Sequence, residues 1–280
     1  MRLVTVEFEG VPRVGVRSGS EGVVLTDYAD MKDLIKDGEA GLARARAALE
    51  SGLPRQGLKL LAPLTAPSKI LCSGINYAAH SDEDAHAKLP AEPSVFSKLP
   101  SSIIGPNEAI MIPAPDCQAD YEVELAFIIG KTAKHVPKER AFDYIFGYTV
   151  MNDVSERARQ FRLQHETIGK GVDTFCPIGP EIVLPDELAD PSQLRISAYV
   201  NGELRQDAHT SQQIFSIPVM IEYLTSMFTL NPGDIISTGT PAGCGAFMNP
   251  PQYLQPGDHV TVEVEGVGRL SNPVAAGWKA

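Results

Sequence analysis

The sequence lacks the patterns that mark several classes of protein. Only four of its 280 residues are cysteines, and no two of them form a Cys-x-x-Cys pair. This argues against a disulfide framework or a zinc site and predicts free, buried thiols in a cytoplasmic protein. No stretch approaches the ~18 consecutive apolar residues of a membrane span. The N-terminal "MRLVTVEFEG" is typical of a strand and lacks the basic-then-apolar pattern of a signal peptide.

Basic residues are also few. The chain has 24 Lys and Arg against 35 Asp and Glu, for a formal net charge of -11. Such a surface makes nucleic acid a poor partner, because binding it needs Lys and Arg against phosphate. The Gly-Lys-Ser/Thr ending of a P-loop, the G-x-S-x-G elbow and the G-x-G-x-x-G fingerprint are missing as well. Hydrophobic residues make up 43% of the chain, which is enough for a substantial core.

The order of the predicted elements indicates two domains. Residues 1–28 contain short strand-like runs broken by Gly and Ser, and the apolar spacing over residues 30–50 predicts one helix with two glycines in its middle. "APLTAP" at 62–67 predicts a loop. We therefore place a small N-terminal α+β domain at 1–65 and a larger domain at 66–280.

Strand-like runs dominate the larger domain, from "SKILCSGINY" to "HVTVEVEGVGRL". Within it, "VNGEL" carries the Asn-Gly of a tight hairpin, and "SIPVMIEYLTSMF" predicts a helix that begins near Pro218. Many strands and few helices indicate a β-rich α+β fold and not an alternating α/β one.

Two carboxylates share one side of a predicted strand in "DYEVELAFIIG". Side chains alternate along a strand, so Glu122 and Glu124 point the same way. Two like charges beside an apolar interior repel each other and lose hydration. Either this is a solvated edge strand with both side chains in water, or a hard divalent cation lies between them.

A third carboxylate, Asp153, ends the strand-like run "FGYTVMND". Carboxylates without a nearby Cys and His pattern favour Mg²⁺ or Mn²⁺ over Zn²⁺, and three ligands leave about half an octahedron for substrate and water. Taken alone, Asp153 is equally well explained as the N-cap of a helix over "SERARQ".

Two further segments contain groups suited to proton transfer and charge stabilisation. In "GINYAAHSDED", His80 and Glu83 are spaced for one helical turn, where a carboxylate can orient an imidazole base; an exposed turn is the plainer explanation. The polar residues 81–93 suit a mobile lid. Lys170 lies between two glycines and is either an oxyanion-stabilising group or a surface lysine. Thr240, in the loop "STGTPAGCG", could bind a carboxylate together with the loop amides.

These stretches together resemble the fumarylacetoacetate hydrolase family. The resemblance is carried by "GINYAAH", "PSVFSKLPSSIIGP", "DYEVELAFIIG", "GYTVMNDVSERARQ", "GKGVDTFCPIGP", "VNGELRQ" and "STGTPAGCG", in this order, from about residue 66 to the end. It implies a mixed β-roll or barrel-like catalytic domain that forms a homodimer.

The resemblance also implies roles for individual residues. Glu122, Glu124 and Asp153 match the family's metal triad for Mg²⁺ or Mn²⁺. The water-activating pair and the lysine beside the metal correspond to His80, Glu83 and Lys170. The substrate pocket is matched by Arg157, Gln160 and Thr240. Four residues depart from the usual family pattern, namely Gly171, Val172, Glu181 and His209.

Family members act on small 2-oxo acids, and several reactions share one metal-stabilised enolate. Our first hypothesis is a Mg²⁺- or Mn²⁺-dependent hydrolase that cleaves a C–C bond in a 2,4-dioxo acid, such as an acylpyruvate or a diketo sugar acid, with water activated by His80 and Glu83. The alternative is an oxaloacetate-type decarboxylase or keto–enol isomerase on the same metal site. A non-catalytic binding protein is the third hypothesis, and the intact carboxylate triad argues against it.

Overall fold

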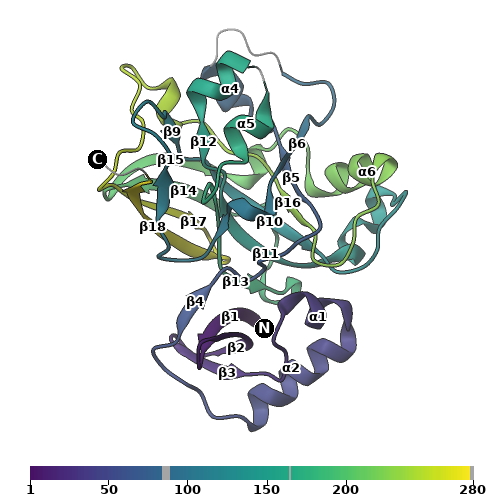
Figure 1. Cartoon of the computed structure of the whole chain (residues 1–280). Coiled ribbons are helices and arrows are strands. Elements are labelled where there is room, and N and C mark those ends of the chain that lie inside the picture. The colour runs from purple at the N-terminus through teal and green to yellow at the C-terminus, as the bar shows by residue number, and fades with distance from the viewer. Residues whose placement is uncertain (84–88, 164, 278–280) are drawn as a thin grey trace.

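The structure, a computed structural model, describes residues 1–83, 89–163 and 165–277. Two lobes are visible, a smaller lower one built from the first 61 residues and a larger upper one (Figure 1). The lower lobe contains β1 (Arg2–Phe8), β2 (Val11–Ser18), β3 (Gly22–Leu25), α1 (Met31–Lys36), α2 (Glu39–Ser51) and β4 (Lys59–Leu61).

The described residues form three sheets. The largest has eleven strands and the order β3-β2-β1-β13-β11-β10-β16-β5-β6, with β4 paired to β1 and β7 paired to β13. Its upper-lobe strands are β5 (Ile70–Ser73), β6 (Val95–Lys98), β7 (Ile103–Ile104), β10 (Val123–Ile129), β11 (Ile145–Asn152), β13 (Cys176–Val183) and β16 (Ile235–Ser237). The five-stranded sheet has the order β15-β14-β17-β18-β8 and contains β8 (Ile110–Ile112), β14 (Arg195–Val200), β15 (Glu203–His209), β17 (His259–Val264) and β18 (Gly268–Ala276). The third sheet pairs β9 (Ala119–Asp120) with β12 (Ser155–Glu156).

Helices are few and short. The upper lobe has α3 (Ala78–Glu83), α4 (Arg157–Leu163), α5 (Glu166–Lys170) and α6 (Ile217–Met227), with 3₁₀ turns at Pro100–Ser102, Lys138–Tyr144, Pro185–Glu187, Thr210–Gln212 and Gly245–Phe247. The predicted β-rich α+β class is confirmed. The described strands pair along open paths, so the barrel-like expectation does not extend to a closed barrel.

The centre of the large sheet is buried on both faces. Every residue of β10 and β11 is buried. This burial accounts for the uninterrupted apolar run "LAFII" that follows Glu124 in β10. One face of the sheet packs into a core with β14 and β17, and the other into a core with α1 and β5. Strands held on both faces give a rigid base for the side chains at their ends.

The single helix predicted over residues 30–50 is wrong. Two helices, α1 and α2, are present instead, because Asp37 ends the first and Gly38 takes φ +55° at the start of the second. This left-handed conformation is readily adopted by glycine and interrupts the helical ladder. The break lets α2 pack against β2 and β3 while α1 packs against α2.

Two other local predictions are confirmed. Asn201 and Gly202, both with positive φ, form the turn between β14 and β15, and α6 begins one residue before Pro218. The predicted lid, residues 81–93, includes residues 84–88, which lie outside the described residues. The two-domain boundary at residue 65 stays a prediction, and β1 pairs directly with β13 across it.

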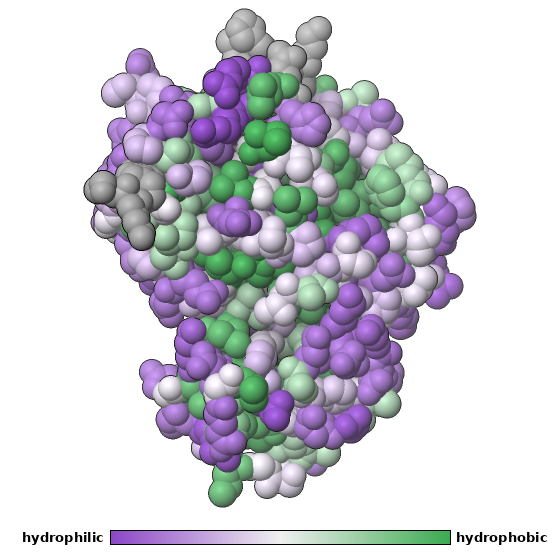
Figure 2. Space-filling view, in the orientation of Figure 1, coloured by the Kyte–Doolittle hydropathy of each residue, from purple (hydrophilic) through white to green (hydrophobic). Residues whose placement is uncertain are grey.

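Glu181 fastens the lower lobe to the upper one. This side chain of β13 is 9% exposed and accepts hydrogen bonds from Arg2 Nη1 (2.5 Å) and Arg17 Nε (2.9 Å). Glu181, which departs from the usual family pattern, therefore contributes ion pairs to the junction between the lobes. Polar and apolar residues are interspersed on the face seen in Figure 2, which also shows a narrow waist between the lobes. None of the described helices is both long and apolar enough to cross a membrane.

Candidate active site

The three predicted metal ligands meet at the ends of two paired strands. Glu122 precedes β10, Glu124 lies within it, and Asp153 follows the neighbouring strand β11. The two strands are antiparallel, and Asp153 N donates to Glu122 O over 2.8 Å. All three side chains are buried, and one oxygen of each lies within 4.8 Å of the others. The solvated-edge explanation of the two glutamates and the helix N-cap explanation of Asp153 are therefore both wrong, since α4 begins only at Arg157.

Buried cations surround these carboxylates. Lys170 Nζ donates to Glu122 Oε2 over 2.7 Å and to Asp153 Oδ2 over 2.8 Å. Lys98 Nζ donates to the other oxygen of Asp153 over 2.6 Å. Arg157 Nη2 donates to Glu122 Oε1 over 2.5 Å. Lys170 is thus a buried group of the site and not a surface lysine.

Burial and neighbouring charges shift the pKa values of three side chains in the site. Burial raises the pKa of Glu122, but the charges of Lys170 and Arg157 outweigh it and lower that pKa well below the usual range. Burial lowers the pKa of Lys170, and the carboxylates of Asp153 and Glu122 more than reverse this. Burial, together with the charges of Asp153 and Glu122, raises the pKa of Glu124 well above its usual range.

Glu124 shows that the residues present fit a hard divalent cation. Its Oε2 accepts from Ser237 Oγ and from Gly239 N (2.9 Å), whereas within the described part of the chain Oε1 accepts no hydrogen bond. The free oxygen faces two other carboxylates in a buried site, where a proton or a cation is needed to offset repulsion. Carboxylate oxygens are the ligands that Mg²⁺ and Mn²⁺ prefer. Glu122, Glu124 and Asp153 would therefore hold the ion.

His80 and Glu83 form a pair held by the glycine-rich loop. His80 Nδ1 lies 2.9 Å from Glu83 Oε2, and Glu83 Oε1 accepts from Gly243 N over 2.7 Å. Because an ionised carboxylate can only accept, Nδ1 carries a proton, and in the neutral imidazole Nε2 is then the nitrogen that can act as a base. Gly243 has φ +106°, and a Cβ there would lie 2.1 Å from Arg205 O, so the loop needs glycine at this point.

Thr240 is positioned by a buried glutamine from β15. Gln206 Nε2 donates to Thr240 Oγ1 (2.8 Å) and to Pro241 O (2.7 Å), and Gln206 Oε1 accepts from Val123 N (2.9 Å). Since the Thr240 oxygen already accepts a hydrogen bond, its own O–H is available to a ligand. One side chain thereby links the glycine-rich loop to the strand that carries the glutamates.

Arg157 and Gln160 form a second polar wall. Arg157 Nε donates to Asp120 Oδ2 over 3.0 Å, and Nη1 donates to Gln160 Oε1 over 3.1 Å. Gln160 Nε2 in turn donates to Glu166 Oε2 over 2.8 Å. Most guanidinium hydrogens are thus directed at protein partners, so Arg157 shapes the wall more than it can grip a substrate.

One cavity of about 240 Å³ brings nearly all the predicted residues together. Its lining includes His80, Glu122, Glu124, Arg157, Gln160, Lys170 and Thr240, with Ser73, Gly74, Ile75, Ser94, Phe96 and Glu166. Glu83 and Asp153 stand directly behind this lining, in contact with His80 and Lys170.

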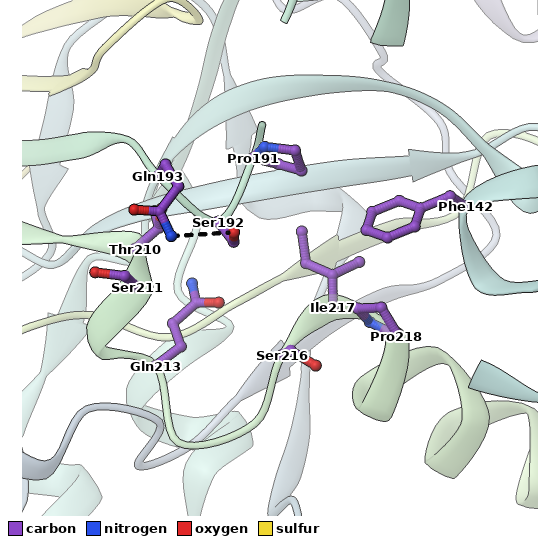
Figure 3. Close-up of a pocket in the computed structure, with 10 residues that line it drawn as sticks. All are labelled: Phe142, Pro191, Ser192, Gln193, Thr210, Ser211, Gln213, Ser216, Ile217 and Pro218. Atoms are coloured by element: carbon purple, nitrogen blue, oxygen red, sulfur yellow. Dashed lines mark hydrogen bonds between the residues drawn. The ribbon is translucent and has the colours of Figure 1, made fainter. Parts of the chain in front are cut away.

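A second cavity, of about 170 Å³, lies near the start of α6 (Figure 3). Figure 3 shows Phe142 and Ile217 on one side of it and Gln193 and Gln213 on the other. Its described lining contains no acid, histidine, lysine or cysteine, so it offers neither a base nor a metal ligand. Chemistry therefore favours the cavity at the carboxylate triad.

Three buried polar residues of the site were missed by reasoning from the sequence. Asp120 accepts from Arg157 and from the amides of Gly245 and Ala246, while Lys98 and Gln206 hold Asp153 and Thr240. Lys98 and Gln206 occur within quoted family stretches, but a lone lysine or glutamine on a strand carries no local sign of burial. Of the departures from the family pattern, Gly171 caps α5, and His209 Nδ1 contacts Ser211 Oγ at 2.7 Å.

Comparison with known proteins shows the family. The family model "Fumarylacetoacetate (FAA) hydrolase C-terminal" matches residues 69–275. The chain belongs to the fumarylacetoacetate hydrolase family. A mitochondrial oxaloacetate tautomerase of Xenopus laevis is 41% identical over 98% of this chain and 90% of its own length.

Two solved structures of family members resemble the whole chain. A fumarylacetoacetate hydrolase from psychrophilic Exiguobacterium antarcticum has a TM-score of 0.89 and 36% identity, with 99% of each chain covered. A maleylpyruvate hydrolase from Sphingobium sp. SYK-6, in complex with manganese(II) and pyruvate, has a TM-score of 0.84 and 32% identity, covering 99% of this chain and 100% of that one. Family members thus include tautomerases and hydrolases of small organic acids, and one solved relative contains a divalent metal.

Proposed function

We propose that this protein is a Mg²⁺- or Mn²⁺-dependent keto–enol tautomerase that acts on oxaloacetate or a closely similar 2-oxo acid. The proposal rests on a histidine base, a buried lysine and a carboxylate triad that share one cavity. The identity to oxaloacetate tautomerases over nearly the whole chain supports this reaction among those that the family performs. It was our alternative hypothesis from the sequence, and the relatives favour it over the hydrolase.

The reaction moves one proton between C3 and the oxygen on C2 of the substrate. His80 Nε2, unprotonated in the resting site, takes the C3 proton, and Glu83 stabilises the resulting imidazolium. Lys170 stays protonated between Glu122 and Asp153 and stabilises the charge that develops on the C2 oxygen. The proton then returns from His80 to that oxygen, so the enzyme ends unchanged and the substrate is only isomerised.

The remaining residues bind and orient the substrate. A divalent ion on Glu122, Glu124 and Asp153 would supply a Lewis acid that acidifies the C3 proton. Thr240 O–H and the amides of its loop bind a substrate carboxylate. Gln160 and Arg157 limit the far side of the cavity.

Hydrolysis of a C–C bond in a 2,4-dioxo acid is the second candidate. The same pair, His80 and Glu83, could remove a proton from water, and the maleylpyruvate hydrolase shares the fold at 32% identity. Decarboxylation of oxaloacetate would use the metal site and Lys170 without activated water. The three reactions differ in products and can be separated directly.

The first experiment strips the protein with a chelator, restores Mn²⁺ or Mg²⁺, and supplies enol-oxaloacetate and an acylpyruvate in parallel. Ultraviolet absorbance follows loss of the enol, and mass spectrometry identifies products. Metal-dependent loss of the enol at constant mass supports the tautomerase. Release of CO₂ indicates a decarboxylase, and pyruvate plus a carboxylic acid from the acylpyruvate indicates a hydrolase. If none of the substrates changes in a metal-dependent way, the enzymatic assignment is contradicted.

A histidine variant tests the role of the base. We expect His80→Gln to lower kcat for tautomerisation by about 10²- to 10⁴-fold, the usual contribution of a positioned general base. His259→Gln, at the exposed first residue of β17, is the matched control and should leave kcat unchanged. Equal kcat values for wild type and His80→Gln would exclude this residue as the base.

The homodimer remains a prediction from the family resemblance, and so does the cytoplasmic location. Sedimentation velocity of the full chain measures the first directly. A monomer at micromolar concentration would contradict it.

A further inference from the structure

His80, Glu83 and Cys244 form a second cluster of metal-binding side chains beside the carboxylate triad. One ligand atom from each residue lies within 4.8 Å of the other two. Cys244 Sγ is 4.0 Å from His80 Nδ1, which is itself 2.9 Å from Glu83 Oε2. The two clusters differ in chemistry, because one offers only oxygens and the other offers sulfur, nitrogen and oxygen.

We propose that His80, Glu83 and Cys244 bind a soft divalent cation, Zn²⁺ being the best match, and that filling this site inhibits the enzyme. The site itself is independent of the reaction assigned above. Its inhibitory effect rests on the proposed function, because that function makes His80 the proton acceptor.

The geometry suits a small tetrahedral ion. Bonds of about 2.0–2.3 Å from Zn²⁺ to nitrogen, oxygen and sulfur place neighbouring ligand atoms roughly 3.3–3.7 Å apart. The observed separations of 4.0 Å and 2.9 Å lie on either side of this range, so side-chain shifts of about half an ångström are sufficient. The fourth position is left for water or a substrate atom from the cavity that His80 lines.

The backbone already brings the three ligands together. The glycine-rich loop carries Cys244 and, through Gly243 N, holds Glu83 Oε1 at 2.7 Å. Gln206 Nε2, whose two hydrogens go to Thr240 and Pro241, lies 3.7 Å from Cys244 Sγ and helps to fix the position of the loop. Cys244 is fully buried, whereas the side chains of His80 and Glu83 are 13% and 19% exposed, so an ion can enter from their side.

The two sites should select different metal ions, because their ligand atoms differ in chemical hardness. Mg²⁺ and Mn²⁺ prefer the oxygen-only triad, and thiolate with imidazole selects Zn²⁺. Binding converts the Cys244 thiol to a thiolate and releases one proton to solvent. It also takes the lone pair of His80 Nδ1, which moves the imidazole proton to Nε2. The nitrogen that would accept the substrate proton is then blocked, and proton transfer stops.

The test uses Co²⁺ as a spectroscopic substitute for Zn²⁺ on the full chain already saturated with Mg²⁺. We expect a thiolate-to-Co²⁺ charge-transfer absorption band in wild type and in the control Cys117→Ser, but none in Cys244→Ser. In the activity assay, loss of the sulfur ligand should raise the Zn²⁺ concentration for half-inhibition by at least about tenfold. Cobalt that binds without the band, or a band that persists in Cys244→Ser, would overturn the proposal.

A second measurement needs no variant. Zinc X-ray absorption on the wild-type protein should show one sulfur neighbour at about 2.3 Å, and a shell of oxygen and nitrogen alone would overturn the site. Both spectroscopic readouts are independent of turnover, so they stand even if no 2-oxo acid is isomerised. If sulfur ligation is found but Zn²⁺ leaves turnover unchanged, the inhibitory half of the proposal is wrong.

Discussion

Lys98 donates a hydrogen bond to Oδ1 of Asp153 over 2.6 Å, and neither side chain is exposed to solvent. The same ammonium group donates to Val154 O over 3.0 Å. A buried charge without a partner is strongly destabilising, whereas a paired one is not. Lys98 therefore gives the buried Asp153 carboxylate a second cationic partner besides Lys170.

Replacing Lys98 by methionine tests this relationship. We expect the metal-free variant to lose about 3–5 kcal/mol of unfolding free energy, because Asp153 is left buried with one partner fewer. Saturating Mn²⁺ should restore part of that loss, since the cation supplies the missing charge. Urea denaturation with chelator and with Mn²⁺ measures both quantities. Lys69→Met, which removes the partially exposed partner of Asp234, is the control, and its loss should not respond to Mn²⁺.

Metal removal is tested at Glu124, whose Oε1 accepts no hydrogen bond from the described residues. Glu124→Gln should abolish the rise in Tm that Mn²⁺ causes in wild type, where ligand at 100 times Kd adds about 2.7 kcal/mol. Activity with Mn²⁺ should fall at least about a hundredfold, because a metal ion contributes several kcal/mol to the barrier. Glu222→Gln, at an exposed position of α6, is the matched control. A normal Mn²⁺ response in Glu124→Gln would remove this residue from the metal site.

The shared direction of Glu122 and Glu124 could be predicted from the sequence because its signal is local, through the strand period alone. Asp153 joined them as a triad only through the family resemblance. Lys98 and Gln206 could not be predicted in the same way. Their roles depend on contacts with Asp153 and Thr240, which are distant in sequence and become neighbours only through the sheet order.

In the lower lobe, local sequence patterns predicted only part of the structure. Its strands follow from short strand-like runs broken by Gly and Ser, but the helix over residues 30–50 is divided at Gly38, where a packed pair of helices outweighs continuous helical spacing. Glu181 was recognised only as an unusual residue, and its partners Arg2 and Arg17 lie more than 160 residues away. The periodicity of the sequence cannot predict a contact between residues so far apart in the chain.

Gln206 should act on substrate binding more than on chemistry. Gln206→Ala removes the hydrogen bonds to Thr240 Oγ1 and Pro241 O and leaves the Val123 amide unpaired, at a cost of about 1–3 kcal/mol. With the glycine-rich loop no longer held, we expect KM to rise about tenfold while kcat changes less, since 1.4 kcal/mol corresponds to a factor of ten. Steady-state kinetics separate the two parameters. A fall in kcat at constant KM would instead place Gln206 in the chemical step.

Glu181 should stabilise the junction between lobes without affecting catalysis. Glu181→Gln leaves two arginines without their carboxylate partner, and we expect a loss of about 1–3 kcal/mol of unfolding free energy. Limited proteolysis should cut the lower lobe faster, while kcat with Mn²⁺ stays at the wild-type value. Glu187→Gln, whose exposed carboxylate pairs with the N-terminus, is the control and should change stability little. Unchanged proteolysis of Glu181→Gln would show that the ion pairs do not hold the lobes together.

Alkaline pH should destabilise the fold through its buried thiols. Burial, with a smaller contribution from the charge of Glu156, raises the pKa of Cys117 from 9.0 to about 12. Between these values the unfolded chain loses the thiol proton and the folded chain keeps it, so stability is fully present below pH 9 and falls as pH rises toward 12. One such group changes the unfolding free energy by at most about 1.4 kcal/mol per pH unit. Urea denaturation across this window should show a smaller slope for Cys117→Ala than for wild type, and identical slopes would mean that this thiol ionises equally in both states.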